Sequence, residues 1–303
     1  MILLTGATGL LGSAIRQNLD RTGGAYVCTS RDAVDLTDFN STLAFFKEHR
    51  PTSVVHSAAR VHGLMGNSRF PAEIFDENLT INYNVIAAGY RTGVRKFNVA
   101  STVAAYPGEL TENIHESQYL MGEPHAGESA YAHSKRAMLA QLEAYAKQYG
   151  ISYSYAIFTN LYGPGDRFDT ENGHVVPSLV AKFHHAARTG TAVPVWGRGR
   201  AQRDFIYIDD AAAAMLHVAE TGEGRFNIAT GTTVPIAEVV QILSDISGVR
   251  DIQWQHEKPE GQLTRSYDVS RLRATGFAPR FSLHEGLERT YRWYEQNWPD
   301  VRT

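Results

Sequence analysis

Residues 1–12, MILLTGATGLLG, place a short apolar run before three glycines at three-residue spacing, Gly6, Gly9 and Gly12. An amphipathic run, SAIRQNLDRTG (13–23), follows, so this order predicts a strand, a tight turn and a helix. Glycines suit such a turn because a backbone pressed against a pyrophosphate leaves no room for Cβ atoms. The free N–H groups at the helix start then face the anion. The alternative is an ordinary strand-to-helix turn, but this context favours a dinucleotide site.

The composition is that of an ordinary globular protein, with 303 residues, 43% of them hydrophobic and 20% charged. This length suits one large domain or two unequal ones. A net charge of −3 shows no excess of basic residues of the kind that binds nucleic acid or an acidic membrane surface. The single cysteine, Cys28, excludes an intrachain disulfide framework. The single cysteine agrees with a reducing cytoplasm, and we expect no signal peptide because glycines interrupt the short first apolar run. No apolar stretch approaches the ~20 residues of a membrane span.

After the first turn, strand-like and helix-like stretches alternate. Strands are expected at 25–30, 52–59 and 96–102, and helices at 38–50 and 72–94. This alternation predicts an α/β fold with a Rossmann-type doubly wound parallel sheet.

The second half of the chain is less regular, which predicts a smaller C-terminal α/β substrate domain. The expected dinucleotide-binding domain comprises 1–163 with returning segments at about 204–230, and the tail 282–303 is a further candidate for return. The expected substrate domain comprises 164–203 and 231–281. The site should lie in the cleft between the domains, at the carboxyl ends of the strands.

The end of the second predicted strand bears on the choice of cofactor. An acidic residue there would bind the 2′-hydroxyl of NAD, whereas this chain has Ser30 and Arg31. A guanidinium suits a 2′-phosphate, which favours NADP. Asp32 follows directly, and a solvated turn is the alternative role for Arg31. In DLTD (35–38), a side chain and a backbone amide can approach the adenine, or the segment can cap the next helix.

The third predicted strand ends in small residues. Ala58 and Ala59 leave space where the backbone would pass the cofactor. His56 lies inside this strand, and we interpret it as a packing residue because nothing acidic or nucleophilic is adjacent in sequence. Residues 61–71 have turn character, and we expect them to form a loop over the substrate.

A candidate catalytic set follows the fourth predicted strand. Tyr131 and Lys135 are four residues apart in SAYAHSKRAM, so on a helix they share one face. An adjacent ammonium group favours the phenolate and lowers the tyrosine pKa, which permits proton exchange with a carbonyl or alcohol. Thr102 ends the strand and could orient the same oxygen, while a nicotinamide exchanges the hydride. The Y-x-x-x-K spacing is common on helices, and it supports a catalytic role here only because it follows the glycine turn.

Over nearly its whole length the chain resembles the extended short-chain dehydrogenase/reductases that act on nucleotide sugars. The matching motifs are GATGLLG (6–12), DLTD (35–38), VVHSAA (54–59), ASTVAAYPG (100–108), YAHSK (131–135), NLYGPGD (160–166), WGRGRAQRDFIYIDDAA (196–212), FNIATG (226–231) and KPEGQLTRSYDVSRL (258–272). Within that family, the chain is most similar to the GDP-L-fucose synthase branch.

The resemblance implies a role for individual residues. Contacts to the pyrophosphate are implied for Gly6, Thr8, Gly9, Leu10, Leu11 and Gly12, and a contact to the 2′-phosphate of NADP for Arg31. Contacts to adenine are implied for Asp35 and Leu36, and contacts at the nicotinamide end for Thr159, Asn160 and Leu161. Further cofactor contacts are implied for Ala58, Ala59, Tyr131, Lys135 and His174. Catalytic roles are implied for Thr102, Tyr131, Lys135 and His174. Contacts to the sugar nucleotide are implied for Thr102, Asn160, His174, Lys182, Trp196, Arg203 and Arg265. Independently, guanidinium groups suit a diphosphate and an indole suits ring packing.

The chain departs from this branch at one position. The branch carries a cysteine two residues after the catalytic serine, which acts as the base of C3 and C5 epimerisation, and a histidine matching His174 acts as the acid. Counting back from Tyr106, the serine aligns with Thr102 and the cysteine with Ala104. Because alanine cannot take a proton, the sequence keeps the reductase residues and lacks half of the epimerase pair.

The sequence therefore predicts an enzyme that uses NADPH to reduce C4 of a GDP-linked 4-keto-6-deoxy sugar, hexose or heptose, without epimerisation. The alternatives are a full epimerase and reductase, a 4-epimerase or 4,6-dehydratase with bound NAD, and a dinucleotide-sensing regulator. Val103, where dehydratases usually carry an acidic residue, argues against dehydration. The resemblance also implies a homodimer formed through helix 129–149, which carries Met138, Leu139 and Leu142, and its predecessor. No histidine spacing indicates a metal site.

Overall fold

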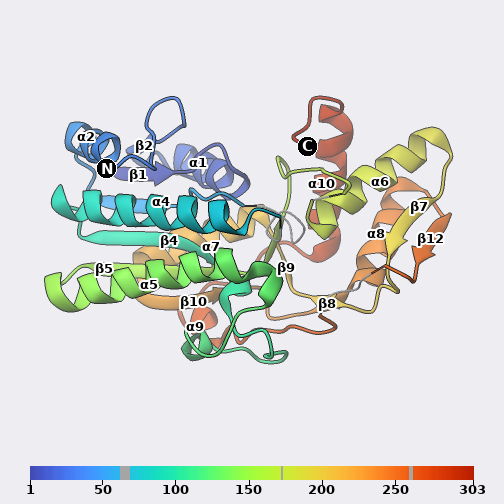
Figure 1. The fold of residues 1–303 in the computed structure, drawn as a ribbon. Coiled ribbons are helices and arrows are strands. Elements are labelled where there is room, and N and C mark those ends of the chain that lie inside the picture. Colours follow the sequence, from blue (N-terminus) through green and yellow to red (C-terminus); the bar gives the residue numbers. More distant parts are fainter. Residues whose placement is uncertain (62–68, 172, 259–261) are drawn as a thin grey trace.

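The computed structural model describes residues 1–61, 69–171, 173–258 and 262–303. Figure 1 shows a larger group of elements around a sheet and a smaller group built from later segments. The sheet has six parallel strands in the order β10-β5-β4-β3-β1-β2. Their bounds are β1 (Ile2–Thr5), β2 (Tyr26–Cys28), β3 (Ser53–His56), β4 (Lys96–Thr102), β5 (Ser152–Phe158) and β10 (Gly224–Ile228). The prediction of a doubly wound parallel sheet is confirmed.

Strand β1 lies inside the sheet and is covered on both faces. Successive side chains of a strand point to opposite faces, so Leu3 joins one hydrophobic cluster and Leu4 the other. Both are fully buried, which accounts for the unbroken apolar run at this point of the sequence. The chain places β2 on one side of β1 and β3 on the other. Ligands of such sheets bind where the strand order reverses in this way, beyond the carboxyl ends of the strands.

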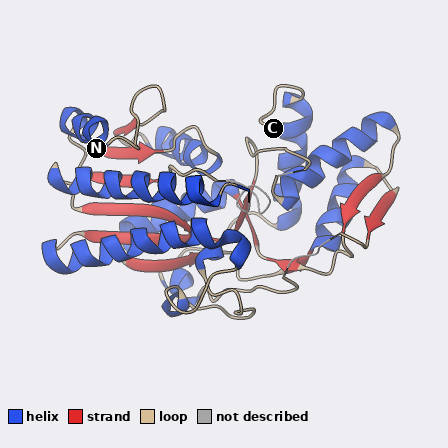
Figure 2. Ribbon diagram, viewed as in Figure 1, coloured by secondary structure: helices blue, strands red, loops and turns tan. Residues whose placement is uncertain are grey.

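Helices cover both faces of the sheet (Figures 1 and 2). On one face, α4 packs between α2 and α5, and on the other α1 packs on α7. Their bounds are α1 (Leu10–Thr22), α2 (Phe39–His49), α4 (Pro71–Arg91), α5 (Ser129–Tyr149) and α7 (Ile208–Thr221). Short helical segments are η1 (Val103–Ala105), η2 (Glu116–Gln118), η3 (Ala126–Glu128) and α9 (Ser270–Ala274). Among the described residues, no helix is both long and apolar enough to cross a membrane.

The smaller group contains three helices and three two-stranded pairings. The helices are α6 (Val175–Thr189), α8 (Ile236–Ser247) and α10 (Leu283–Asn297). The pairs are β7 (Val193–Trp196) with β12 (Ile252–Gln255), β8 (Gln202–Arg203) with β11 (Val234–Pro235), and β6 (Asn160–Tyr162) with β9 (Phe205–Tyr207).

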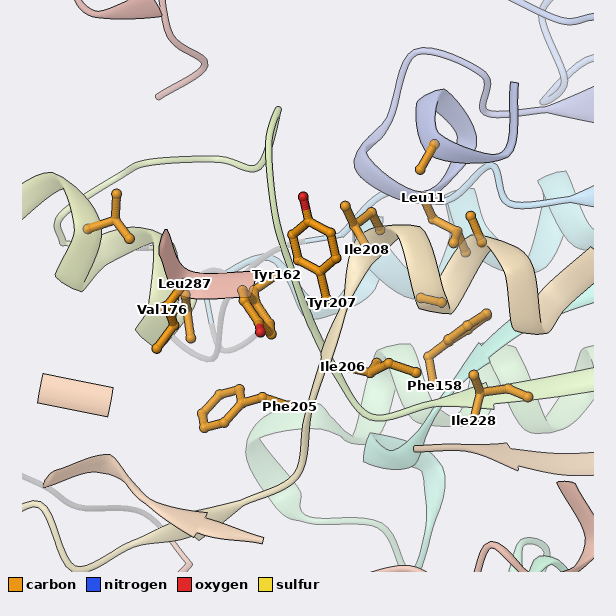
Figure 3. Close-up of a cluster of buried hydrophobic side chains, with 14 of the residues drawn as sticks. Leu11, Phe158, Tyr162, Val176, Phe205, Ile206, Tyr207, Ile208, Ile228 and Leu287 are labelled. Carbon is orange, nitrogen blue, oxygen red and sulfur yellow. The ribbon is translucent and has the colours of Figure 1, made fainter. Parts of the chain in front are cut away.

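One hydrophobic cluster joins the two groups (Figure 3). It contains Phe158 and Leu11 of the larger group together with Val176 and Leu287 of the smaller one. Helix α10 packs on α6 and α8, and Tyr162 donates a hydrogen bond to the Leu283 carbonyl. Helix α10 also contacts β9, which lies in the segment 204–230 expected in the first domain, so it packs on segments expected of both domains. The domain boundaries, with the return of 282–303 to the first domain among them, stay a proposal, because the core is continuous across them.

Several elements are shorter than their patterns predicted, for local reasons. The strand expected at 52–59 ends at His56, because beyond it the Ser57 hydroxyl donates to the Thr5 carbonyl as the chain turns past β1. Asp38 is the N-cap of α2 and accepts a hydrogen bond from the Ser41 amide, as expected of a cap within 35–38.

The turn between β6 and α6 buries a carboxyl group. Asp166 is 5% exposed, and one of its oxygens has no partner among the described residues. Burial raises the pKa of Asp166 to about 7, against the lowering effects of the Arg167 amide and of Arg302. At a pH between the ordinary pKa of Asp166 in the unfolded chain and its raised pKa in the folded protein, the folded state holds a proton that the unfolded state lacks. The free energy of unfolding therefore falls as the pH rises through this range.

We expect Asp166→Asn to stabilise the protein near pH 8 by up to about 4 kcal/mol, since each pKa unit is worth ~1.4 kcal/mol, and to change little near pH 4. Urea unfolding at both pH values measures this difference. Asp76→Asn, on the exposed side of α4, is the matched control. Equal effects of Asp166→Asn at the two pH values would contradict the assignment.

Candidate active site

The glycine turn between β1 and α1 packs backbone against backbone. Gly6 has φ +72°, and a Cβ added there would lie 2.6 Å from the Ala58 nitrogen. A Cβ on Gly12 would lie 2.0 Å from the Gly6 carbonyl oxygen. Gly9 is the N-cap of α1, and no described side chain caps its free N–H groups. Gly6 and Gly12 therefore have room only for a hydrogen atom, and the N–H groups at the start of α1 have no side-chain cap. Both features fit the pyrophosphate of a dinucleotide.

The other residues predicted around this turn differ in exposure. Thr8 is exposed and Leu10 half-buried, whereas Leu11 packs into the core and can offer only its backbone to a cofactor. Ala58 donates through its amide to the Thr5 hydroxyl, and Ala59 beside it is half-buried. The structure brings this set together at the sheet edge where the strand order reverses, but its cofactor contacts stay predictions.

The adenosine side is more open. Arg31 is exposed, and its guanidinium has no hydrogen-bond or ion-pair partner in the described part of the chain. Asp35 accepts two hydrogen bonds from Thr37, at 2.8 and 2.6 Å, and these hydrogen bonds lower its pKa. Leu36 is buried, and its carbonyl accepts from the Asn84 amide, which ties this loop to α4. A free guanidinium at this position fits a 2′-phosphate.

We expect NADPH to be preferred over NADH by at least about tenfold in kcat/KM, because a charge-assisted phosphate contact contributes ~1.5–3 kcal/mol. Arg31→Ala should remove most of this preference in steady-state kinetics with each cofactor. Lys47→Ala removes an exposed cation from α2 and serves as the control. Equal efficiency of wild type with both cofactors would refute this role for Arg31.

The prediction that His56 is a packing residue is confirmed. Its Nδ1 lies 2.6 Å from the Thr5 hydroxyl and its Nε2 lies 3.0 Å from the Asn82 amide oxygen. Burial, together with the charge of Lys135, lowers the pKa of His56 to about 3, so the ring stays neutral. It links β1, β3 and α4 beneath the site.

The predicted catalytic set lies where β4 meets α5. Tyr131 and Lys135 share a face of α5, with the Lys135 Nζ 5.7 Å from the centre of the Tyr131 ring. The Lys135 ammonium donates to the Ala100 carbonyl of β4 at 3.0 Å. Thr102 ends β4, and its hydroxyl oxygen accepts a hydrogen bond from the Ala104 amide at 3.1 Å. The structure thus draws the end of β4 against the helix turn that carries Tyr131 and Lys135.

The expected lowering of the Tyr131 pKa is wrong for this arrangement. Burial raises the pKa of Tyr131, and the nearby Tyr119 and Glu128 act in the same direction. Lys135 is itself 2% exposed, and burial lowers its pKa to about 8. Its ammonium is directed to a backbone carbonyl, and desolvation is the largest cause of the rise in the Tyr131 pKa. Tyr131 is therefore a neutral phenol at neutral pH, the form that donates a proton.

The smaller group contributes a pocket of about 220 Å³. It contains two of the predicted substrate residues, Lys182 and Trp196, and is lined by Thr170, Glu171, Gly173, Val175, Ser178, Leu179, Lys182, Val195, Trp196, Gly199, Ala201 and Ile236. The Trp196 ring is 45% exposed, with the Lys182 and Lys258 ammonium groups 5.8 and 5.6 Å from it. An exposed indole beside two cations suits an aromatic ligand that also carries negative charge.

Arg203 and Arg265 lie near one another. Burial lowers the pKa of Arg203, and the charge of Arg265 acts in the same direction. Arg265 is 5% exposed; it donates to the Pro107 carbonyl at 3.1 Å, while its buried Nε has no partner among the described residues. Arg203 donates to the Gln202 carbonyl. In the described ranges neither guanidinium forms an ion pair, so this pair of cations suits a diphosphate.

Other predicted residues are placed less directly. Asn160 donates its amide to the Asp204 carbonyl at 2.8 Å, which ties β6 to β9, and Leu161 packs against the shared core. His174 is the N-cap of α6; its ring is open to water, although the surrounding protein lowers its pKa by desolvation. No described interaction links His174 to Tyr131. In the loop predicted over the substrate, residues 62–68 lie outside the described residues.

The sequence reasoning missed two features of this site. Glu128 is the N-cap of α5, three residues before Tyr131, and its charge acts on both Tyr131 and Arg203. The three-residue spacing could have identified it. Ser101, Tyr119 and Tyr155 form a buried hydroxyl cluster behind the catalytic set, for which no local pattern gives a signal. Among the described residues, no group of three or more His, Cys, Asp or Glu is placed to hold a metal ion.

Comparison with known proteins agrees with this arrangement. Residues 2–229 match the model of the NAD dependent epimerase/dehydratase family. The chain is 33% identical to the GDP-L-fucose synthase of Escherichia coli (strain K12), over 98% of this chain and 97% of that protein. A GDP-6-OMe-4-keto-L-xylo-heptose reductase from C. jejuni superposes with a TM-score of 0.91 at 25% identity, over 98% of this chain and 97% of that one. A GDP-mannoheptose C4 reductase from Campylobacter jejuni with NADP bound gives a TM-score of 0.88 at 26% identity, over 97% and 98%.

Proposed function

The chain belongs to the NAD dependent epimerase/dehydratase family, and from this membership we propose that it uses NADPH to reduce C4 of a GDP-linked 4-keto-6-deoxy sugar. The sugar is a hexose or a heptose, and C3 and C5 keep their configurations. The observation that carries the proposal is the junction of β4 and α5, where Thr102 ends β4 beside Ala104 and Lys135, which shares a helix face with Tyr131, donates to the Ala100 carbonyl of β4. This junction holds the reductase residues and offers alanine where an epimerase needs a base.

Tyr131 acts as the acid of the reaction. Its neutral phenol donates a proton to the C4 oxygen, and the hydroxyl of Thr102 donates a hydrogen bond that orients the same oxygen. Lys135 stabilises the phenolate that remains, because its ammonium lies on the same helix face. When bound, NADPH supplies the hydride. The uncapped N-terminus of α1 holds the pyrophosphate of that cofactor, and Arg31 holds its 2′-phosphate.

The GDP portion of the substrate extends toward the smaller group. Arg203 and Arg265 bind the diphosphate as paired guanidinium groups, for which burial strengthens each charge-assisted contact. Trp196 provides a flat face for a ring, and Lys182 lies in the same pocket. Together these contacts orient C4 toward Tyr131.

The test of this proposal is a panel of nucleotide-linked 4-keto sugars incubated with enzyme and NADPH, followed by the loss of nicotinamide absorbance. We expect turnover with a GDP-linked 4-keto-6-deoxy sugar and a much lower rate with the UDP-linked analogue. Comparison of hexose and heptose substrates then assigns the sugar. Absence of turnover with every GDP-linked ketone would refute the proposed function.

We further propose that the enzyme is a homodimer formed through α4 and α5. Met138, Leu139 and Leu142 do not form the interface, because all three are buried inside the monomer. The same helix pair instead exposes Tyr83 (48%) and Tyr149 (41%). Exposed aromatic rings on two adjacent helices suit a two-fold interface.

Light scattering at micromolar concentration should give the mass of a dimer for the wild type. Tyr83→Glu should yield monomers, because it places a charge at the centre of the paired faces. Leu120→Glu, at an exposed position outside these helices, should leave the dimer intact. A monomeric wild type, or a dimer that tolerates Tyr83→Glu, would contradict this interface.

A further inference from the structure

Three buried hydroxyl groups meet directly behind the catalytic set. The Ser101 hydroxyl donates to Tyr155 at 2.8 Å and lies 2.5 Å from the Tyr119 hydroxyl. The two phenol oxygens are 3.2 Å apart. Ser101 belongs to β4, Tyr155 to β5, and Tyr119 follows η2, so three separate segments converge here. We call Ser101, Tyr119 and Tyr155 the hydroxyl cluster.

The hydroxyl cluster connects the end of β4 to the backbone of α5. Tyr155 donates to the Lys135 carbonyl at 2.7 Å. Ser101 belongs to β4 and directly precedes Thr102, so its hydroxyl holds the strand end next to Thr102. A path of hydrogen bonds therefore joins the strand end that carries Thr102 to the helix turn that carries Lys135, through Ser101 and Tyr155. The bond from the Lys135 ammonium to the Ala100 carbonyl spans the same junction.

The hydroxyl cluster is suited to fixing the positions of neighbouring segments rather than to transferring protons. Burial raises the pKa of Tyr119 to about 12 and that of Tyr155 well above its ordinary value, so both stay neutral phenols. Tyr119 also packs edge-on against Tyr106 and Tyr155, with ring centres 5.1 and 5.4 Å apart. Buried hydroxyls are costly unless they are hydrogen-bonded, and a network whose members are all paired becomes rigid.

We propose that Ser101, Tyr119 and Tyr155 are positioning residues, which fix the end of β4 against α5 so that Thr102, Tyr131 and Lys135 keep their mutual alignment. This role rests on the proposed reductase function. None of the three touches the reacting atoms. Small errors in alignment reduce the rate of a positioned proton transfer without changing how tightly the substrates bind. The hydroxyl cluster should therefore affect kcat and leave KM nearly unchanged.

The experiment compares Tyr119→Phe and Tyr155→Phe with Tyr153→Phe. Tyr153 lies on β5 two residues from Tyr155, and its hydroxyl has no hydrogen bond within the described ranges. Each change removes one oxygen and keeps the ring, so packing is preserved. We expect kcat to fall about 5- to 30-fold for the two cluster variants, with KM for NADPH and for the sugar within about twofold of wild type. The Tyr153→Phe control should match wild type in both constants.

A second measurement works without substrate. Amide hydrogen exchange should become faster at 100–104 and 131–137 in the two cluster variants, and remain unchanged in Tyr153→Phe. If the wild type reduces the sugar and the cluster variants match the control in kcat, the positioning role is overturned. If the wild type reduces no sugar, faster exchange at both segments supports the positioning role while the proposed function fails, and unchanged exchange overturns both. Near-UV circular dichroism verifies that each variant is folded. If Tyr119→Phe unfolds, the kinetic and exchange measurements on Tyr155→Phe decide the outcome.

Discussion

Tyr131→Phe is expected to lower kcat by ~10²-fold or more, with little loss of sugar binding. The phenol is neutral and close to Lys135, so we propose it as the proton donor of the reduction. Phenylalanine keeps the ring and its packing but has no proton to give. Steady-state kinetics with NADPH, together with a binding measurement for the sugar nucleotide, separates the effect on chemistry from the effect on affinity.

Two variants of the same helix serve as comparisons. Tyr145→Phe removes a hydroxyl from α5 away from the site, and its kcat should equal that of the wild type. Lys135→Ala should lower both kcat and the affinity for NADPH, because this ammonium stabilises the phenolate and is expected to contact the ribose. Near-normal turnover by Tyr131→Phe would refute the mechanism.

The second large effect concerns proton exchange at the carbons next to the ketone. Epimerisation requires a base within hydrogen-bond reach of the C–H and an acid on the opposite face. The resemblance implies that Ala104 occupies the place of that base; it is 7% exposed, has no titratable group, and donates its amide to the Thr102 hydroxyl. Loss of a positioned base costs ~10²–10⁴ in rate, so reduction should outrun epimerisation.

Incubation of the keto sugar in D₂O with enzyme and NADP⁺ tests this directly, because no reduction can then occur. Proton NMR should show no deuterium at C3 or C5 beyond the enzyme-free control. Ala104→Cys restores a thiol at this position and should accelerate exchange if His174 supplies the acid. His174→Gln in the Ala104→Cys background should remove that gain.

Faster exchange by the wild type than by the enzyme-free control would show that another group acts as the base. His174 would be one candidate, and a full epimerase and reductase would then be the better description. Glu128 would be a second, because it is the N-cap of α5 and its charge acts on Tyr131. His62, considered from the sequence, lies outside the described residues. Glu128→Gln would distinguish the second candidate from the others.

Local sequence was sufficient for the parts of this protein that depend on neighbours along the chain. The glycine turn could be predicted because Gly6 and Gly12 occupy positions where a Cβ would meet backbone within 3 Å. Tyr131 and Lys135 could be paired because the helical period places residues four apart on one face.

Tertiary structure alone decided the properties that depend on surroundings. The rise in the Tyr131 pKa comes from desolvation and from Tyr119, twelve positions earlier in the chain, and the spacing of Tyr131 and Lys135 predicted the opposite. The hydroxyl cluster joins Ser101 to Tyr155 across 54 positions, and Arg265 reaches Pro107 across 158. Periodicity carries no information about such contacts, because the energy of a charge or a hydroxyl depends on the solvent it loses and the partners it meets only when the chain has folded.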